Sequence, residues 1–122
     1  MNPPFGNPGA PVIDHEVISE LKSLGSGTLL ERVLGLFVTK VPEALGDIAR
    51  LAVQADRRAF ADAVHGLKSM CLNIGARRAA AACDELEALA RGNGEFDPIS
   101  GTARIAREAA EAIREISLLR AA

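Results

Sequence analysis

The sequence predicts an all-α protein, an antiparallel up-down four-helix bundle with an additional short N-terminal helix. Apolar residues recur every three or four positions along most of the chain, the spacing of one face of an α-helix. Alanine is abundant at 76–90 and 103–112, whereas only four Phe and no Trp or Tyr are present, which favours closely packed helices over sheets. Short Gly-containing segments separate the stretches with this helical spacing, so neighbouring helices should run antiparallel.

Length and composition are those of one globular domain. Of the 122 residues, 48% are hydrophobic and 25% are charged, with a formal net charge of −2. This balance lacks the positive charge that binding to nucleic acid requires, so DNA and RNA are not expected partners. No apolar run approaches the roughly 18 to 20 residues of a membrane span, and the first residues hold Pro and Gly where a secretion signal would be apolar. We expect a cytoplasmic monomer without membrane contact.

Residues 1–13 are predicted to be a flexible tail, and residues 14–122 to form the helical bundle. Four prolines and two glycines in the tail disfavour regular structure. Asp14 is a suitable N-cap, and apolar residues follow at helical spacing until Gly25-Ser26-Gly27. This first helix is short and should lie across one end of the bundle.

A second helix is predicted to begin near Thr28 and to continue for about six turns. Its apolar face consists of Leu30, Val33, Leu34, Phe37, Val38, Val41, Leu45, Ile48 and Leu51. Pro42 lies within it, removes one backbone donor and crowds the carbonyl four residues earlier. We expect a kink at Pro42, with a full break into two helices as the alternative.

The third and fourth helices are predicted at about 56–73 and 76–91, with Gly75 as the left-handed residue between them. Their core stripes are Phe60, Val64, Leu67, Cys71 and Ile74 on the third helix, and Ala79, Cys83, Leu86 and Ala90 on the fourth. Both cysteines lie on these stripes without metal-binding spacing. We interpret them as core thiols, with a disulfide or metal role as the alternative.

A fifth helix should begin at Asp97-Pro98, after Gly92-Asn93-Gly94 ends the fourth, because an aspartate N-cap precedes a first-turn proline. Its predicted inner face consists of Ile99, Thr102/Ala103, Ala106, Ala109/Ala110, Ile113 and Ile116.

His65 lies off the core stripe of the third helix. At 100° per residue and with Phe60 at zero, the stripe falls within about 40° of zero, whereas His65 falls at about 140° and Lys68 at about 80°. His65 should therefore face solvent, unlike a histidine that only fills a core. The Lys68 ammonium, one turn further on, is close enough to pair with a phosphoryl group on the imidazole.

Three further residues should surround His65. Ser69 is small and lies where a large side chain would lean over the imidazole, so it keeps the approach open. Ala61 and Leu72 would place apolar area beside His65 for a docking partner to bury. Leu72 can equally be a boundary residue at a helix end.

These residues resemble the histidine phosphotransfer (HPt) domain family of multistep phosphorelays. The family carries His-x-Leu-Lys-Gly/Ser, then a Gly-Ala turn and a Leu-Glu pair on the next helix. This chain has His65-Gly66-Leu67-Lys68-Ser69, Gly75-Ala76 and Leu86-Glu87. The resemblance implies that His65 accepts a phosphoryl group, that Lys68 stabilises it and that Glu87 faces the site. Glu87 either orients His65 or forms an exposed salt bridge with Lys68 or Arg91, the simpler interpretation.

The implied function is that of a phosphocarrier rather than an enzyme. His65 would accept a phosphoryl group from the phospho-aspartate of a receiver domain, in a response regulator or hybrid histidine kinase, and pass it to another receiver domain. A neutral imidazole is available near neutral pH and needs no separate base. The chain has no GxxxxGK[ST] loop, nucleotide lid or carboxylate ladder for Mg²⁺, so no cofactor is expected, and Mg²⁺ should come with the receiver.

Three alternatives predict different residues. The dimerisation and phosphoacceptor helices of a histidine kinase usually carry an acid directly after the His and then a Thr/Asn-Pro kink, which Gly66 and Met70 do not match. A metal-based bundle would use two Glu-x-x-His motifs, which neither His15 nor His65 completes. A non-catalytic helical docking module would acquire no acid-labile phosphate.

Overall fold

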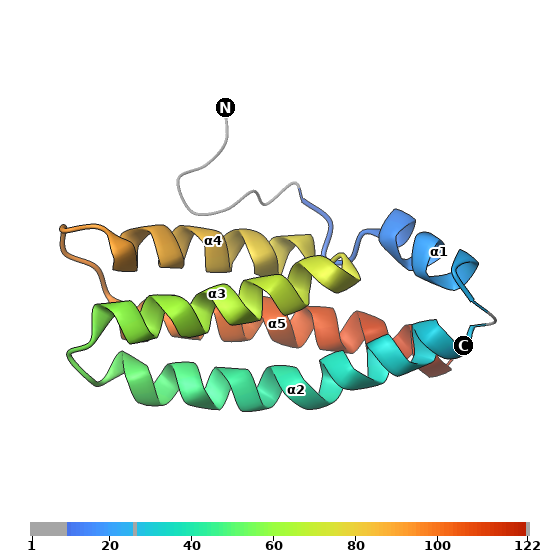
Figure 1. The fold of residues 1–122 in the computed structure, drawn as a ribbon, viewed down its shortest axis with the longest axis horizontal. Helices are drawn as coiled ribbons and strands as arrows, with labels where there is room; N and C mark the ends of the chain where they lie inside the picture. The colour runs from blue at the N-terminus through green and yellow to red at the C-terminus, as the bar shows by residue number, and fades with distance from the viewer. Residues whose placement is uncertain (1–9, 26, 122) are drawn as a thin grey trace.

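The computed structural model describes residues 10–25 and 27–121, and every regular element in this part of the chain is an α-helix (Figure 1). The helices are α1 (His15–Ser23), α2 (Thr28–Ala52), α3 (Arg57–Ile74), α4 (Arg77–Arg91) and α5 (Pro98–Ala121). The prediction of an all-helical chain with a short first helix is confirmed.

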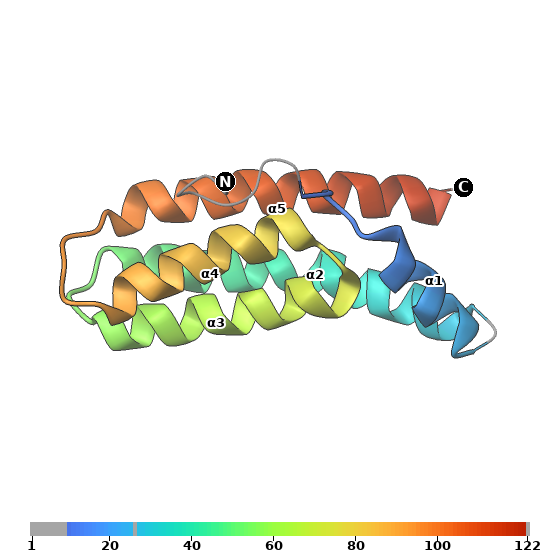
Figure 2. The same ribbon diagram turned by 90° about the horizontal axis from the view of Figure 1, so that it is seen from above.

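The four long helices lie side by side, with α1 at one end (Figures 1 and 2). In Figure 1 the chain runs along α2, returns along α3, and changes direction again in α4 and in α5. α3 and α5 each pack against both α2 and α4, so the long helices enclose one core. α1 contacts α2 and α3 and has no fully buried residue, so it adds little to that core.

The core contains the stripes expected from helical spacing. Every predicted core residue of α3 and α4 is at most 5% exposed: Phe60, Val64, Leu67, Cys71, Ile74, Ala79, Cys83, Leu86 and Ala90. Cys71 and Cys83 are both free and buried, as expected of core thiols. Because the stripe of α3 is buried, the opposite side of that helix carries the exposed residues.

Aspartate N-caps fix where three helices begin. The side chains of Asp14, Asp56 and Asp97 accept hydrogen bonds at 3.0–3.1 Å from backbone N–H groups two or three residues further on. Gly75 ends α3 in the left-handed conformation, with φ of 78°. Caps of this kind act within a few residues, which explains why the helix limits could be predicted closely.

Pro42 lies inside one uninterrupted helix, so the chain does not break there. Figure 1 shows that α2 bends along its length, with its first turns inclined to the rest. The expected kink, rather than the full break, matches this shape.

The buried face of α5 is rotated from the predicted one. Thr102, Ala109 and Ile116 are buried as expected, but Ile99 is 62% exposed. Ile105 and Ala112 are buried in its place. Alanine occurs on several sides of this helix, so the contrast between its faces was too weak to fix the rotation.

The packed part of the chain begins before residue 14. Residues 1–9 of the predicted flexible tail lie outside the described residues. Ile13 is 1% exposed and belongs to the core, and the Arg78 guanidinium donates hydrogen bonds to the Ala10 carbonyl. The Asp14 N–H donates to the Gly75 carbonyl at 2.7 Å. These contacts with the α3–α4 turn hold residues 10–13 against the bundle.

Candidate functional site

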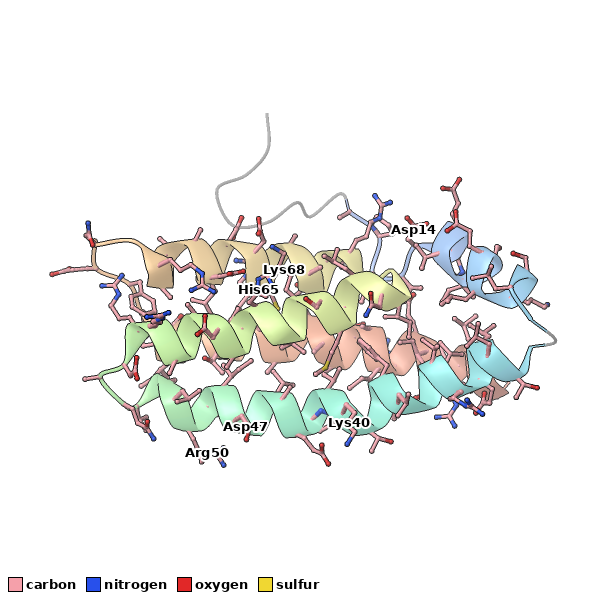
Figure 3. All side chains as sticks on the ribbon, in the orientation of Figure 1. Asp14, Lys40, Asp47, Arg50, His65 and Lys68 are labelled. Carbon is pink, nitrogen blue, oxygen red and sulfur yellow. The ribbon has the colours of Figure 1, made fainter. Side chains whose placement is uncertain are left out.

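His65 projects from α3 toward α4, with 56% of its side chain exposed. Figure 3 shows it next to Lys68 where these two helices meet. Its neighbours Val64 and Leu67 are fully buried, so the α3 backbone is anchored on both sides of the histidine. An exposed imidazole on a rigid helix is accessible to a partner while its position stays fixed.

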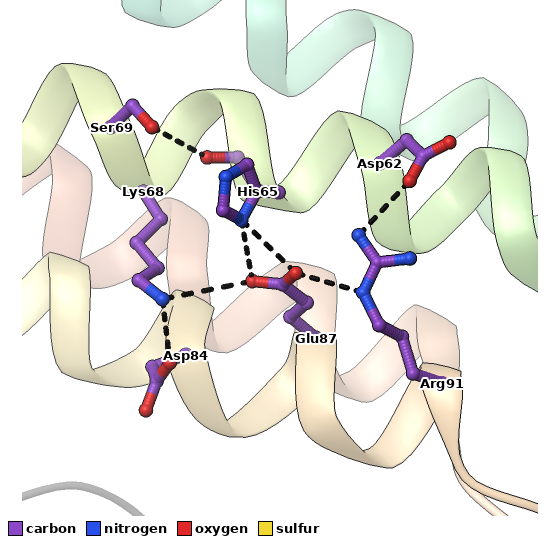
Figure 4. Close-up of polar contacts among 7 residues, drawn as sticks. All are labelled: Asp62, His65, Lys68, Ser69, Asp84, Glu87 and Arg91. Atoms are coloured by element: carbon purple, nitrogen blue, oxygen red, sulfur yellow. Dashed lines mark hydrogen bonds and ion pairs between the residues drawn. The ribbon is translucent and has the colours of Figure 1, made fainter.

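Glu87 reaches this imidazole from α4. Nδ1 of His65 lies 3.0 Å from Oε1 and 3.1 Å from Oε2 of Glu87 (Figure 4). An ionised carboxylate can only accept hydrogen bonds, so Nδ1 carries the proton and donates it. In the neutral ring this leaves the lone pair on Nε2, which points away from Glu87 in Figure 4.

The hydrogen bonds around Glu87 keep its carboxyl group ionised. Its side chain is only 12% exposed, and this burial acts to raise the pKa. Hydrogen bonds from Arg91 Nε, at 2.9 Å, and from His65 outweigh burial and lower the pKa of Glu87. Glu87 therefore contacts both His65 and Arg91, so the contacts expected under both interpretations are present, but the carboxylate is largely buried instead of exposed.

Lys68 is the cation one turn after His65. Its Nζ donates a hydrogen bond to Asp84 Oδ1 at 2.7 Å and lies 3.8 Å from Glu87 Oε1. The hydrogen bond to Asp84 raises the pKa of Lys68 against the opposing effect of burial, so the ammonium is charged at neutral pH. A positive charge is therefore present on the face of α3 that carries His65.

A second ion pair lies on the other side of Glu87. Arg91 Nη2 donates to Asp62 Oδ1 at 2.9 Å while its Nε binds Glu87 (Figure 4). Two cations and three carboxylates thus gather around one imidazole. The carboxylates outnumber the cations, so the site carries a net negative charge when His65 is neutral.

Of the predicted docking residues, two are exposed and one is not. The Ser69 hydroxyl donates to the His65 backbone carbonyl at 3.2 Å, and Leu72 is 53% exposed. Ala61 is fully buried, which corrects its prediction as docking surface. The last turn of α4 packs on this side of α3, where Arg57 donates hydrogen bonds to the carbonyls of Leu89 and Ala90, so a partner cannot reach Ala61.

A groove of about 610 Å³ opens beside Lys68. Its lining includes Leu72, Ala80, Ala81 and Asp84. The exposed apolar area next to His65 is therefore continuous with a concave surface between α3 and α4.

Asp62 and Asp84 are the two acidic residues of this site that were not singled out from the sequence. Asp84, Glu87 and Arg91 follow one another at intervals of three and four, so they share one face of α4. That spacing is a usable signal. It cannot show that this face meets His65, and Asp62 becomes part of the site only through Arg91.

No three His, Cys, Asp or Glu side chains in the described part of the chain are placed to hold a metal ion. Within residues 10–25 and 27–121, no helix combines the length and apolar character needed to cross a bilayer.

The site thus consists of an exposed histidine, hydrogen-bonded to a carboxylate of the next helix, on the surface of a helical bundle. In the comparison with family models, the Hpt domain model matches residues 32–121. The chain belongs to the Hpt domain family, whose members carry phosphoryl groups on histidine in phosphorelays and interact with receiver domains. No curated protein and no solved structure matches the chain.

Proposed function

We propose that this chain accepts a phosphoryl group on Nε2 of His65 from the phospho-aspartate of one receiver domain and passes it to the aspartate of another. The observation that carries this proposal is the orientation of the imidazole. Its Nδ1–H is held by Glu87, and Nε2 is left free on an exposed side chain.

Phosphoryl acceptance forms one bond and breaks another. Nε2 bonds to phosphorus while the bond between phosphorus and the aspartyl oxygen breaks, and that electron pair stays on the aspartate carboxylate. Because Nδ1 keeps its proton, the phosphorylated ring is positively charged, and the adjacent carboxylate of Glu87 stabilises it. Transfer to the second receiver reverses these changes, and the electron pair returns to Nε2.

Lys68 is the residue we propose for stabilising the transferred group. Phosphoryl transfer passes through a largely dissociative transition state, for which positioning and charge stabilisation matter more than proton transfer. The Lys68 ammonium lies one turn from His65 and is charged at neutral pH. We propose that Mg²⁺ comes with the receiver domain and that this chain contributes the ammonium.

The receiver would dock over Ser69 and Leu72, whose exposure supports this assignment. The groove beside Lys68 extends the same surface. One copy of the chain is sufficient in this proposal, because His65, Lys68 and Glu87 all belong to it.

Incubation with a labelled, phosphorylated receiver domain tests the proposed function. The natural chain should acquire acid-labile phosphate, and His65→Gln should acquire none while circular dichroism shows unchanged helicity. His15→Gln is the matched control, because His15 is the other histidine of the chain and lies on α1. Labelled phosphate retained by His65→Gln would refute the assignment, and an unlabelled natural chain would favour a plain docking module.

A further inference from the structure

We infer that Asp84 is a positioning residue that competes with the phosphoryl group for Lys68, and so limits how strongly the carrier holds its phosphate. This inference rests on the proposed function of His65. It adds to that function a residue that tunes phosphate acceptance and release.

The contacts of Lys68 show where its charge is held. Its Nζ is 2.7 Å from Asp84 Oδ1 but 3.8 Å from the nearer oxygen of Glu87. Of the two carboxylates, only Asp84 is therefore within hydrogen-bonding distance. Asp84 is 67% exposed and lies on α4, so it holds the ammonium at that helix before any phosphate arrives.

The charges around His65 make this competition consequential. A phosphoryl group brings about two negative charges into a set that already contains more carboxylates than cations. Arg91 is held by two carboxylates, Glu87 and Asp62, each at 2.9 Å. Lys68 has one hydrogen-bonded carboxylate, so it is the cation more readily released to the phosphoryl group.

In this proposal, Lys68 exchanges one anionic partner for another when His65 is phosphorylated. The interaction lost with Asp84 offsets part of the interaction gained with the phosphoryl oxygens. The pair is solvent-exposed on one side, so its removal should change rates by only about twofold to fivefold. Modest stabilisation of the phosphoryl group by Lys68 suits a carrier, since this group must leave again for the next receiver.

The site contains a matched control for Asp84. Asp62 is also an exposed aspartate beside His65, with 61% of its side chain exposed, but it pairs with Arg91 instead of Lys68. Asp62→Asn removes the same charge, and Arg91 stays bound to Glu87. Comparison with Asp84→Asn separates release of Lys68 from a general loss of negative charge.

The experiment measures initial phosphorylation of the full chain by phosphoramidate, followed by ³¹P NMR. Asp84→Asn should react about twofold to fivefold faster than the natural chain. Asp62→Asn should gain less than Asp84→Asn, because it leaves the contact between Lys68 and Asp84 in place. Lys68→Ala and the double variant Lys68→Ala/Asp84→Asn should react equally slowly, because Asp84 acts only through Lys68. In parallel, NMR titration should show a lower pKa for Lys68 in Asp84→Asn and an unchanged one in Asp62→Asn.

Several results would overturn the inference while leaving the proposed function intact. These are an unchanged rate in Asp84→Asn, an equal gain in Asp62→Asn, a gain that persists without Lys68, or an unshifted Lys68 pKa in Asp84→Asn. If the natural chain takes up no phosphate on His65, the proposed function itself fails, and the inference fails with it.

Discussion

Nδ1 of His65 lies 3.0 Å from Oε1 of Glu87, although the two residues are 22 positions apart and lie on different helices. This contact decides which ring nitrogen holds the proton. Nδ1 serves to orient the ring and Nε2 is left for reaction. The chemistry proposed for α3 therefore depends on a side chain that α4 supplies.

Replacement of Glu87 should weaken this division of roles. In Glu87→Gln we expect phosphorylation of His65 by phosphoramidate to slow by about threefold to tenfold, because a hydrogen bond to an ionised group becomes a weaker neutral one. The ¹⁵N shifts of the ring should show more of the tautomer protonated on Nε2. Glu85→Gln, which alters a carboxylate paired with Arg104, is the control. An unchanged tautomer would show that Glu87 does not orient the ring.

The lowered pKa of Glu87 predicts a loss of stability in acid. Its pKa in the folded chain lies below the ordinary value of 4.5, so the ionised group stabilises the fold above that pH. The contribution disappears as the pH falls through the lowered pKa. The difference in unfolding free energy between the natural chain and Glu87→Gln should shrink as the pH falls from about 5 through the lowered pKa of Glu87, as measured by urea denaturation. A difference that is constant over this range would contradict the prediction.

Removal of the ammonium beside His65 should slow transfer without unfolding the chain. For Lys68→Ala we expect about a tenfold lower rate of phosphoryl acceptance from a receiver, since charge-assisted contacts to the transferring group are lost. Lys40→Ala should react normally, because Lys40 lies on α2 and pairs with Glu43 (Figure 3). Quench-flow measurements provide both rates. Equal rates for Lys68→Ala and the natural chain would remove Lys68 from the mechanism.

A large side chain at position 69 should block docking. The aromatic ring of Ser69→Phe would lean toward the N-terminus of α3 and cover His65, so receiver affinity should fall about tenfold or more. Stability should change by less than about 0.5 kcal/mol at this exposed position. Thr39→Phe is the matched control for Ser69→Phe, because the Thr39 side chain is also exposed and its hydroxyl also donates to the backbone carbonyl four residues earlier. Titration calorimetry that finds normal binding by Ser69→Phe would exclude this docking surface.

Gly75 should tolerate no side chain. It has φ of 78°, and an added Cβ would lie 3.0 Å from both the Asp14 carbonyl oxygen and the Val17 Cβ. Gly75→Ala should therefore lower the unfolding free energy by about 1–3 kcal/mol. Gly46→Ala is the opposite case, because its Cβ would meet nothing inside α2, and it should stabilise by about 0.5–1 kcal/mol. Thermal unfolding measures both, and an unaffected Gly75→Ala would show that the turn can shift.

The features predicted well from the sequence are local ones. The third helix was expected at about 56–73 and lies at Arg57–Ile74, and its buried stripe and exposed His65 match the 100° spacing. N-caps join residues two or three positions apart, and a helical stripe repeats at every turn. Both signals are complete within a short segment, so neighbouring helices are not needed to interpret them.

Contacts between helices were decided by the tertiary structure. Ala61 and Ile13 were expected outside the core and are buried, whereas Ile99 was expected inside and is exposed. The sequence also did not indicate that Asp84 holds Lys68. Such contacts depend on the rotation and axial position of each helix against its neighbour. The alanine-rich surfaces of α4 and α5 allow several such arrangements at similar burial, so only the assembled bundle selects one.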